Sequence, residues 1–149
     1  MNCSLGKVAA AAAMAFAFTG AALADNAPAS APTSKVVYHV NEGVDKAVPA
    51  LRNVANHLSA EPGAKIVVVT HGPGIDFLLE GAKDKNGNPF DAIVDTLQAK
   101  GVEFRVCNNT LVSRKIDKGR VIPQATIVPS GVAEIGRLQA KEAYVYLKP

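Results

Sequence analysis

The chain has 149 residues, of which 48% are hydrophobic and 19% are charged, and its formal net charge is +3. So weak a positive balance argues against binding to nucleic acid or to an anionic membrane surface. The absence of tryptophan and the 5% share of aromatic residues argue against a carbohydrate-stacking platform.

The first 24 residues have the three parts of a secretory signal peptide. Lys7 lies near the start, an apolar run begins at Val8, and the small-residue pattern Ala22-Leu23-Ala24 follows. We expect cleavage after Ala24 and, in a Gram-negative cell, a periplasmic product. The apolar run is shorter than the roughly 20 residues that span a bilayer, and no other stretch of the sequence is both apolar and long enough, so we expect no membrane span after cleavage.

Residues 25–34 are small, polar and Pro-rich, which predicts a flexible linker ahead of a single domain over residues 35–149. After cleavage, 15 basic and 13 acidic residues remain, for a net charge of about +2. A mature chain of this length buries an ordinary core without disulfides.

The domain alternates between strand-like and helix-like patterns. Strands are predicted at residues 35–40, 65–70, 102–106, 125–129 and 143–147. Helices are predicted from Val44, across 75–82, across 90–99, from Asn108 and after Ser130. This order predicts an α/β sandwich with a mostly parallel five-stranded sheet.

The last two helices are predicted to be amphipathic, with one apolar side each. The first of them carries Leu111, Val112 and Ile116 on that side. The second carries Val132, Ile135 and Leu138, and Ser130 is placed to cap its start.

In parallel α/β sheets the ligand crevice lies outside the carboxyl ends of the strands. Polar and reactive residues follow those ends in this chain, and they form the predicted pocket: Asn41, His71, Gly72, Cys107, Asn108, Asn109 and Ser130. Three scattered histidines and one mature cysteine predict no metal site. We also expect no cofactor, because residues 41–46 lack the Ser/Thr-rich phosphate loop of a flavin binder.

Cys107 is the only cysteine of the mature chain, because Cys3 lies in the predicted signal peptide. It stands between a strand and a helix, where free N–H groups and the helix dipole favour an anion. Such a position can lower a thiol pKa from about 8.5 into a range of roughly 3.5–7.5. The alternative is a small buried core residue, and the position alone leaves both interpretations open.

The neighbours of Cys107 have two interpretations each. His71 could polarise the thiol or simply bond the backbone of its turn. Gly72 belongs to "HGPG", which could form a nest of N–H donors for an anion. Asn41, Asn108 and Asn109 could bind a ligand or cap a helix, and capping is favoured for Asn108 and Asn109. His39 is expected to pack or bond within the fold and His57 to be solvated.

Four segments of the chain resemble the DsrE/DsrF-like family of sulfur-relay proteins: "KVVYHVNEG", "KIVVVTHGPGIDFLL", "GVEFRVCNNTL" and "IVPSGVAEIGRLQAKEAYVYLKP". The resemblance covers residues 35–148 and implies a three-layer α/β/α sandwich with five parallel strands. It also implies assembly into homo- or hetero-oligomers. In the best understood members a cysteine carries sulfur as a persulfide, and only Cys107 matches that role.

Three hypotheses follow. In the first, Cys107 accepts sulfane sulfur from a donor protein and passes it to an acceptor, as a sulfurtransferase-like carrier in an exported protein. In the second, the chain is a non-enzymatic oligomeric binding or scaffold protein in which Cys107 only packs. In the third, Cys107 is a redox sensor that needs a second thiol from elsewhere.

Overall fold

The computed structural model describes Met1 and residues 33–149, so the rest of the predicted signal peptide and most of the linker lie outside the described residues. Five parallel strands form one sheet in the order β4-β3-β2-β1-β5. The strands are β1 (Lys35–Val40), β2 (Lys65–Thr70), β3 (Glu103–Cys107), β4 (Ala125–Val128) and β5 (Val145–Leu147). The predicted α/β fold with a parallel five-stranded sheet is therefore confirmed.

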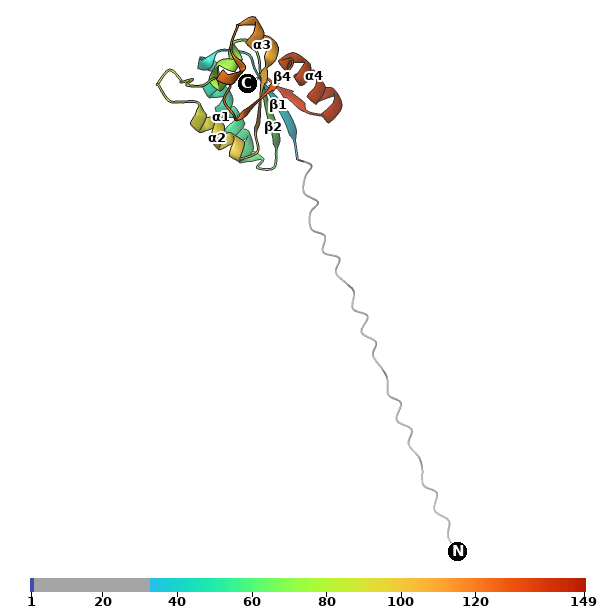
Figure 1. Cartoon of the computed structure of the whole chain (residues 1–149). Coiled ribbons are helices and arrows are strands. Elements are labelled where there is room, and N and C mark those ends of the chain that lie inside the picture. The colour runs from blue at the N-terminus through green and yellow to red at the C-terminus, as the bar shows by residue number, and fades with distance from the viewer. Residues whose placement is uncertain (2–32) are drawn as a thin grey trace.

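Helices cover both faces of the sheet. Figure 1 shows α1 and α2 on one side of the sheet and α4 on the other, which gives the three layers. The α-helices are α1 (Val44–Ala60), α2 (Asp91–Ala99), α3 (Asn108–Ser113) and α4 (Gly131–Glu142). Two 3₁₀ helices complete the fold: η1 (Gly72–Leu78) and η2 (Lys118–Arg120). No helix in the described part of the chain is long and apolar enough to cross a membrane.

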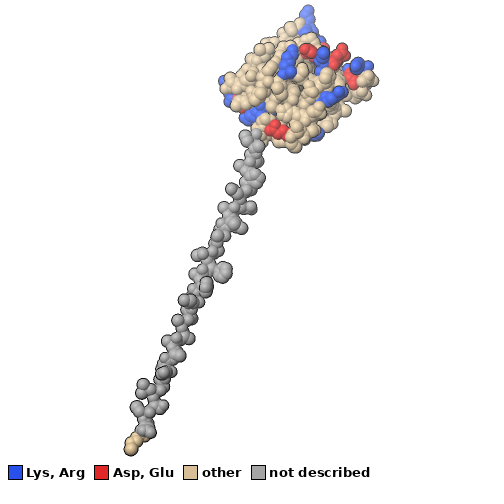
Figure 2. Space-filling view, turned by 180° about the vertical axis from the view of Figure 1, so that it is seen from behind, with Lys and Arg blue, Asp and Glu red and all other residues tan. Residues whose placement is uncertain are grey.

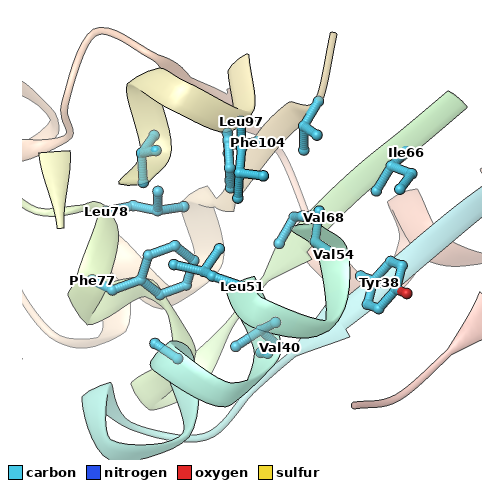
Figure 3. Close-up of a cluster of buried hydrophobic side chains, with 14 of the residues drawn as sticks. Tyr38, Val40, Leu51, Val54, Ile66, Val68, Phe77, Leu78, Leu97 and Phe104 are labelled. Atoms are coloured by element: carbon cyan, nitrogen blue, oxygen red, sulfur yellow. The ribbon is translucent and has the colours of Figure 1, made fainter. Parts of the chain in front are cut away.

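The main core lies between the sheet and the layer formed by α1, η1 and α2. Figure 3 shows Leu51 of α1 and Phe77 of η1 among the buried side chains of this core. The ring of Phe77 lies 5.7 Å from that of Phe90 and 6.4 Å from that of Phe104, centroid to centroid. Because all three rings are at most 2% exposed, they join η1, α2 and β3 into one packed unit.

A second, smaller core lies on the opposite face of the sheet, under α4. It consists of six buried residues: Val37, Val67, Val69, Ile135, Leu138 and Tyr144. Since α4 is the helix packed on this face, polar side chains of the strands find room beside it. Arg105 of β3 pairs there with Glu134 of α4, and the alternation of apolar and polar residues along β3 follows from this arrangement.

Two predictions about the last helices are wrong. Val112 is 65% exposed because α3 ends at Ser113, and the chain turns at Lys115 with a φ of +54° before Ile116 packs. Val132 is 64% exposed because only the later positions of α4 reach the sheet. The short segment predicted at 75–82 is a 3₁₀ helix that begins earlier, at Gly72.

The surface carries charges of both signs. Figure 2 shows Lys and Arg side chains interspersed with Asp and Glu on the face that it views. His57, predicted to be solvated, is instead partly buried, and its Nδ1 is hydrogen-bonded to the hydroxyl of Tyr38 at 3.0 Å. The helix α1 directs this histidine back toward β1.

Candidate functional site

The ends of β2 and β3 bring His71 and Cys107 together. Thr70 and Val106 are in register, so the next residue of each strand lies at the same edge of the sheet. Gly131, the first residue of α4, fits between them. A Cβ on Gly131 would lie 3.2 Å from Cβ of Cys107, 3.3 Å from Cβ of His71 and 3.0 Å from the carbonyl oxygen of Thr70. Only glycine leaves α4 free to start this close to the thiol.

Cys107 is buried, with 4% of its surface exposed, and it is the N-cap residue of α3. Burial raises the pKa of its thiol, but hydrogen bonds from the N–H of Gly131, from the hydroxyl and N–H of Thr110 and from the N–H of Asn109 together outweigh it, so the pKa is lowered. The sulfur thus meets the N-terminal ends of α3 and α4, where an anion is favoured. These polar contacts distinguish Cys107 from a cysteine that packs only against apolar groups.

Thr110 is a site residue that the sequence interpretation did not include. It is 9% exposed, and its Oγ1 accepts a hydrogen bond of 2.9 Å from the N–H of Gly72 while it also contacts the Cys107 thiol. The signal was present, because a hydroxyl residue three positions after an N-cap can reach back to it. Thr110 ties the turn after β2 to the first turn of α3.

Gly72 has a φ of +54°, a conformation that favours glycine. Its N–H is bonded to Thr110 and the N–H of Gly74 is bonded to the carbonyl of His71, so these donors of "HGPG" already have partners. The predicted anion nest is therefore not formed by this turn. The turn instead positions His71 at the edge of the sheet.

The remaining predicted residues occupy different places around this edge. Asn41 and Asn108 are partly buried, and each has a side-chain oxygen without a hydrogen-bond partner. Asn109 is exposed, and its N–H reaches both Cys107 and the carbonyl of Pro129. Ser130 caps α4 by accepting a 3.4 Å hydrogen bond from the N–H of Ala133, as predicted.

Arg105 shares a face of β3 with Cys107 but does not pair with the thiol. Its guanidinium binds Glu134 and, at 2.6 Å, Glu103. Glu134 in turn pairs with Arg137 at 2.8 Å. The positive charge that the sequence placed two residues before the thiol is thus neutralised by carboxylates.

Two histidines are in direct contact at the edge of the sheet that carries Cys107. Nε2 of His39 lies 2.6 Å from Nε2 of His71, and Nδ1 of His39 lies 2.8 Å from the hydroxyl of Tyr146. Burial is the largest cause that lowers the pKa of both imidazoles. The pKa of His39 is lowered further by His71 and then by Lys148, and that of His71 is lowered further by Lys148. Both rings are therefore neutral at pH 7, since their ordinary pKa is about 6.5.

Cavities lie both at this edge and elsewhere. A pocket of about 10 Å³ is lined by residues that include His39, Asn41 and Lys148. Two larger grooves, of about 250 and 290 Å³, lie between α1 and the segment before α2, and neither includes a predicted site residue. Within the described residues, no three His, Cys, Asp or Glu side chains are arranged to hold a metal ion.

Comparisons with known proteins agree with this architecture. A protein of unknown function, MTH1491 from Methanobacterium thermoautotrophicum, is 27% identical with a TM-score of 0.69, over 78% of this chain and 99% of that one. The ychN protein from E. coli is 16% identical with a TM-score of 0.66, over 78% of this chain and 100% of that one. The curated proteins gave no significant match. The model of the DsrE/DsrF-like family matches residues 6–149, so the chain belongs to the DsrE/DsrF-like family.

Proposed function

We propose that this chain is an exported sulfur-relay protein in which Cys107 carries sulfane sulfur as a persulfide and passes it to a partner. Membership of the DsrE/DsrF-like family suggests sulfur relay in general terms. The observation that carries the specific proposal is the position of Cys107, which is the N-cap residue of α3 and lies against Gly131 at the start of α4. The N–H groups of these two helix starts lower the pKa of its thiol. The same donors stabilise the terminal sulfur of a persulfide anion.

The transfer needs one cysteine and no oxidant. The Cys107 thiolate attacks the outer sulfur of a donor persulfide, R–S–S–H, forming a bond between Sγ and that sulfur. The donor S–S bond breaks, its electron pair leaves with the inner sulfur as R–S⁻, and the protein holds Cys107–S–S–H. Release to an acceptor thiolate is the reverse step on a second molecule. A chain with a single mature cysteine is sufficient for both steps.

The burial of Cys107 sets a condition on this function. Because only 4% of the residue is exposed, a donor reaches the sulfur only when the turn after β2 or the start of α4 moves outward. A partner protein that docks at this edge of the sheet would favour that movement. We therefore expect slow reaction with small donors and faster transfer from the physiological partner.

The test uses the full chain with Cys3→Ser, so that Cys107 is the only thiol. The folded protein is treated with a low-molecular-weight persulfide, and the product is analysed by intact mass and peptide mapping. We expect one added sulfur on the peptide that contains Cys107, and none in a Cys107→Ser variant. A folded protein that takes up no sulfur, yet is alkylated normally after unfolding, would show that Cys107 only packs.

We also propose that the protein is exported and self-associates. The apolar edge of β5 supports self-association, because Val145 and Leu147 are 60% and 39% exposed on the face that carries the main core. Light scattering of the full chain should give a mass above that of a monomer, and Val145→Glu should lower it without unfolding the protein. Fractionation of expressing cells tests export, with a cytoplasmic, uncleaved product as the contrary result.

A further inference from the structure

We propose that Tyr146, His39 and His71 form a hydrogen-bonded proton relay that ends beside Cys107 and supplies the proton for the thiolate displaced there. The inference rests on the proposed chemistry of Cys107, since the relay has no role if that thiol does not react. It assigns a function to three side chains that the sulfur-carrier role by itself does not require.

The three residues lie in one line across one face of the sheet. Val37 is in register with Tyr146 of β5, and Val69 of β2 is in register with His39 of β1. Side chains two residues apart on a strand share a face. Tyr146, His39 and His71 therefore all lie on the face covered by α4, as Cys107 does at the end of β3.

The contacts make one continuous chain of hydrogen bonds. The Tyr146 hydroxyl lies 2.8 Å from Nδ1 of His39, whose Nε2 lies 2.6 Å from Nε2 of His71. Two neutral imidazoles joined through Nε2 require one ring to donate and the other to accept. The remaining nitrogen of His71, Nδ1, is then the terminal atom of the chain.

This chain has two states of opposite polarity. When Tyr146 donates to His39, His39 donates to His71, and Nδ1 of His71 carries a proton that it can give away. When Tyr146 accepts from His39, His71 donates to His39, and Nδ1 of His71 is a bare acceptor. Moving one proton along the chain converts one state into the other without placing a net charge on the pair.

His71 and Cys107 are neighbours at the edge of the sheet. The Cβ atoms of His71 and Cys107 lie 3.3 and 3.2 Å from the same point, the Cβ position on Gly131, so they are at most 6.5 Å apart. A donor that reaches Cys107 must pass this edge, where His71 is only partly buried. The relay therefore requires that the donor thiolate is released at the edge of the sheet that carries His71.

The surrounding charges keep the pair neutral. Lys148 follows β5 and lowers the pKa of both histidines, and it is itself paired with Glu42 at 3.5 Å. Lys46 of α1 lines the small pocket on the His39 side. On β3, the guanidinium of Arg105 is paired with the carboxylates of Glu103 and Glu134. The Cys107 thiol lies at the end of the same strand. Among the described residues no carboxylate is bonded to either ring, so a proton is passed on instead of being held as imidazolium.

Thiol–disulfide exchange at Cys107 is coupled to proton transfer along the relay. Cys107–S⁻ attacks R–S–S–R′, the bond from Sγ to the nearer sulfur forms, and R′–S⁻ leaves with the electron pair. Nδ1–H of His71 gives its proton to R′–S⁻, Nε2 of His71 takes the proton of His39, and Nδ1 of His39 takes that of Tyr146. Tyr146 is restored from water. The exchange needs no external oxidant. With a donor persulfide, R–S–S–H, Cys107–S⁻ attacks the outer sulfur and the donor S–S bond breaks. R–S⁻ leaves with the electron pair and takes the proton of His71 Nδ1–H, and the protein holds Cys107–S–S–H.

The experiment compares two uncharged disulfides on the full chain with Cys3→Ser. Hydroxyethyl disulfide releases an alkyl thiolate that needs a proton, whereas dithiodipyridine releases an aromatic thiolate that leaves readily without one. General acid catalysis contributes about 100-fold or more, so we expect His71→Gln to slow exchange with hydroxyethyl disulfide by about that factor. We expect exchange with dithiodipyridine to change by no more than about twofold, because its leaving thiolate has a low pKa.

The outer residues give graded effects. Tyr146→Phe should slow exchange with hydroxyethyl disulfide by about tenfold and leave exchange with dithiodipyridine unchanged, because water then reprotonates His39 less efficiently than the tyrosine hydroxyl does. His57→Gln and Tyr38→Phe are matched controls, since this histidine and tyrosine are also hydrogen-bonded to each other but lie on the α1 side of the sheet. Both controls should react like the parent protein with each disulfide.

Each outcome decides between the proposals. Equal slowing of both disulfides by His71→Gln, no slowing of either, or failure of the parent protein to react with both would overturn the relay. If the parent takes up persulfide sulfur but His71→Gln shows no selective loss, the relay fails and the proposed function stands. If the selective loss is seen but no sulfur is taken up from a persulfide, the relay stands and sulfur carriage fails.

Discussion

Gly131 is the position at which the packing of the site can be tested most directly. Replacing it by Ala adds one methyl group at a point 3.0 Å from the carbonyl oxygen of Thr70, 3.2 Å from Cβ of Cys107 and 3.3 Å from Cβ of His71. None of these atoms is the end of a flexible side chain. The start of α4 must therefore move away from the edge of the sheet.

Overpacking of this kind costs about 1–3 kcal/mol, against which Ala regains up to about 1 kcal/mol of helix propensity relative to Gly. We expect Gly131→Ala to lower the free energy of unfolding by about 1–2 kcal/mol. Gly136→Ala is the matched control in the same helix, because a Cβ there meets nothing within 4 Å. It should raise the free energy of unfolding by about 0.5–1 kcal/mol.

The same substitution acts on the thiol. Moving α4 outward lengthens the hydrogen bond from the Gly131 N–H to the Cys107 sulfur, so the thiol pKa rises toward its ordinary value. Weakening that bond by about 1 kcal/mol lowers the thiolate fraction below the pKa about fivefold. Urea unfolding and the pH dependence of iodoacetamide alkylation measure the two effects. Equal stability of the two Gly variants, with an unchanged alkylation profile, would refute the packing argument.

Two further predictions concern pH. Because the pKa of Cys107 is lowered in the folded protein, the stability of the parent relative to Cys107→Ala should rise as pH increases from the thiol pKa of the folded protein to about 8.5. Urea titrations at several pH values measure this difference in stability, and a difference that does not change with pH would contradict the prediction. The lowered pKa values of His39 and His71 mean that the unfolded chain binds protons first, so stability falls as pH drops below about 6.5. A His39→Gln, His71→Gln double variant should lose less stability than the parent over that range, and an equal loss would disprove the assignment.

The strands and the reactive edge could be predicted because their signals are local. An uninterrupted β-branched run identifies β2, and a cysteine directly after β3 falls at the carboxyl edge of any parallel sheet. Helix lengths are harder to predict. The apolar spacing predicts that Val112 points inward, and this prediction fails because α3 ends early, at Ser113. Its exposure depends on where the chain turns, which apolar periodicity does not record.

The contacts that make up the site depend on strand order and register, which the sequence does not display. The sequence predicts only that His39 packs or bonds within the fold, and its contact with His71 exists because β1 and β2 are neighbours in register. Tyr146 reaches His39 only because β5 is added beside β1. Gly131 approaches Cys107 because α4 crosses the face opposite α1, a choice that no local pattern specifies.

The way in which the thiolate is stabilised bears on what Cys107 can do. A full positive charge beside the sulfur would lower its pKa further, but a thiolate of very low pKa is a weak nucleophile, although it leaves readily. A sulfur carrier must act in both roles, as nucleophile when it accepts sulfur and as leaving group when it releases it. Here Arg105 is held by Glu103 and Glu134, and the sulfur receives neutral N–H and O–H donors instead. Dipolar donors with a neutral histidine pair alongside therefore suit a thiol that exchanges sulfur in both directions better than a cation would.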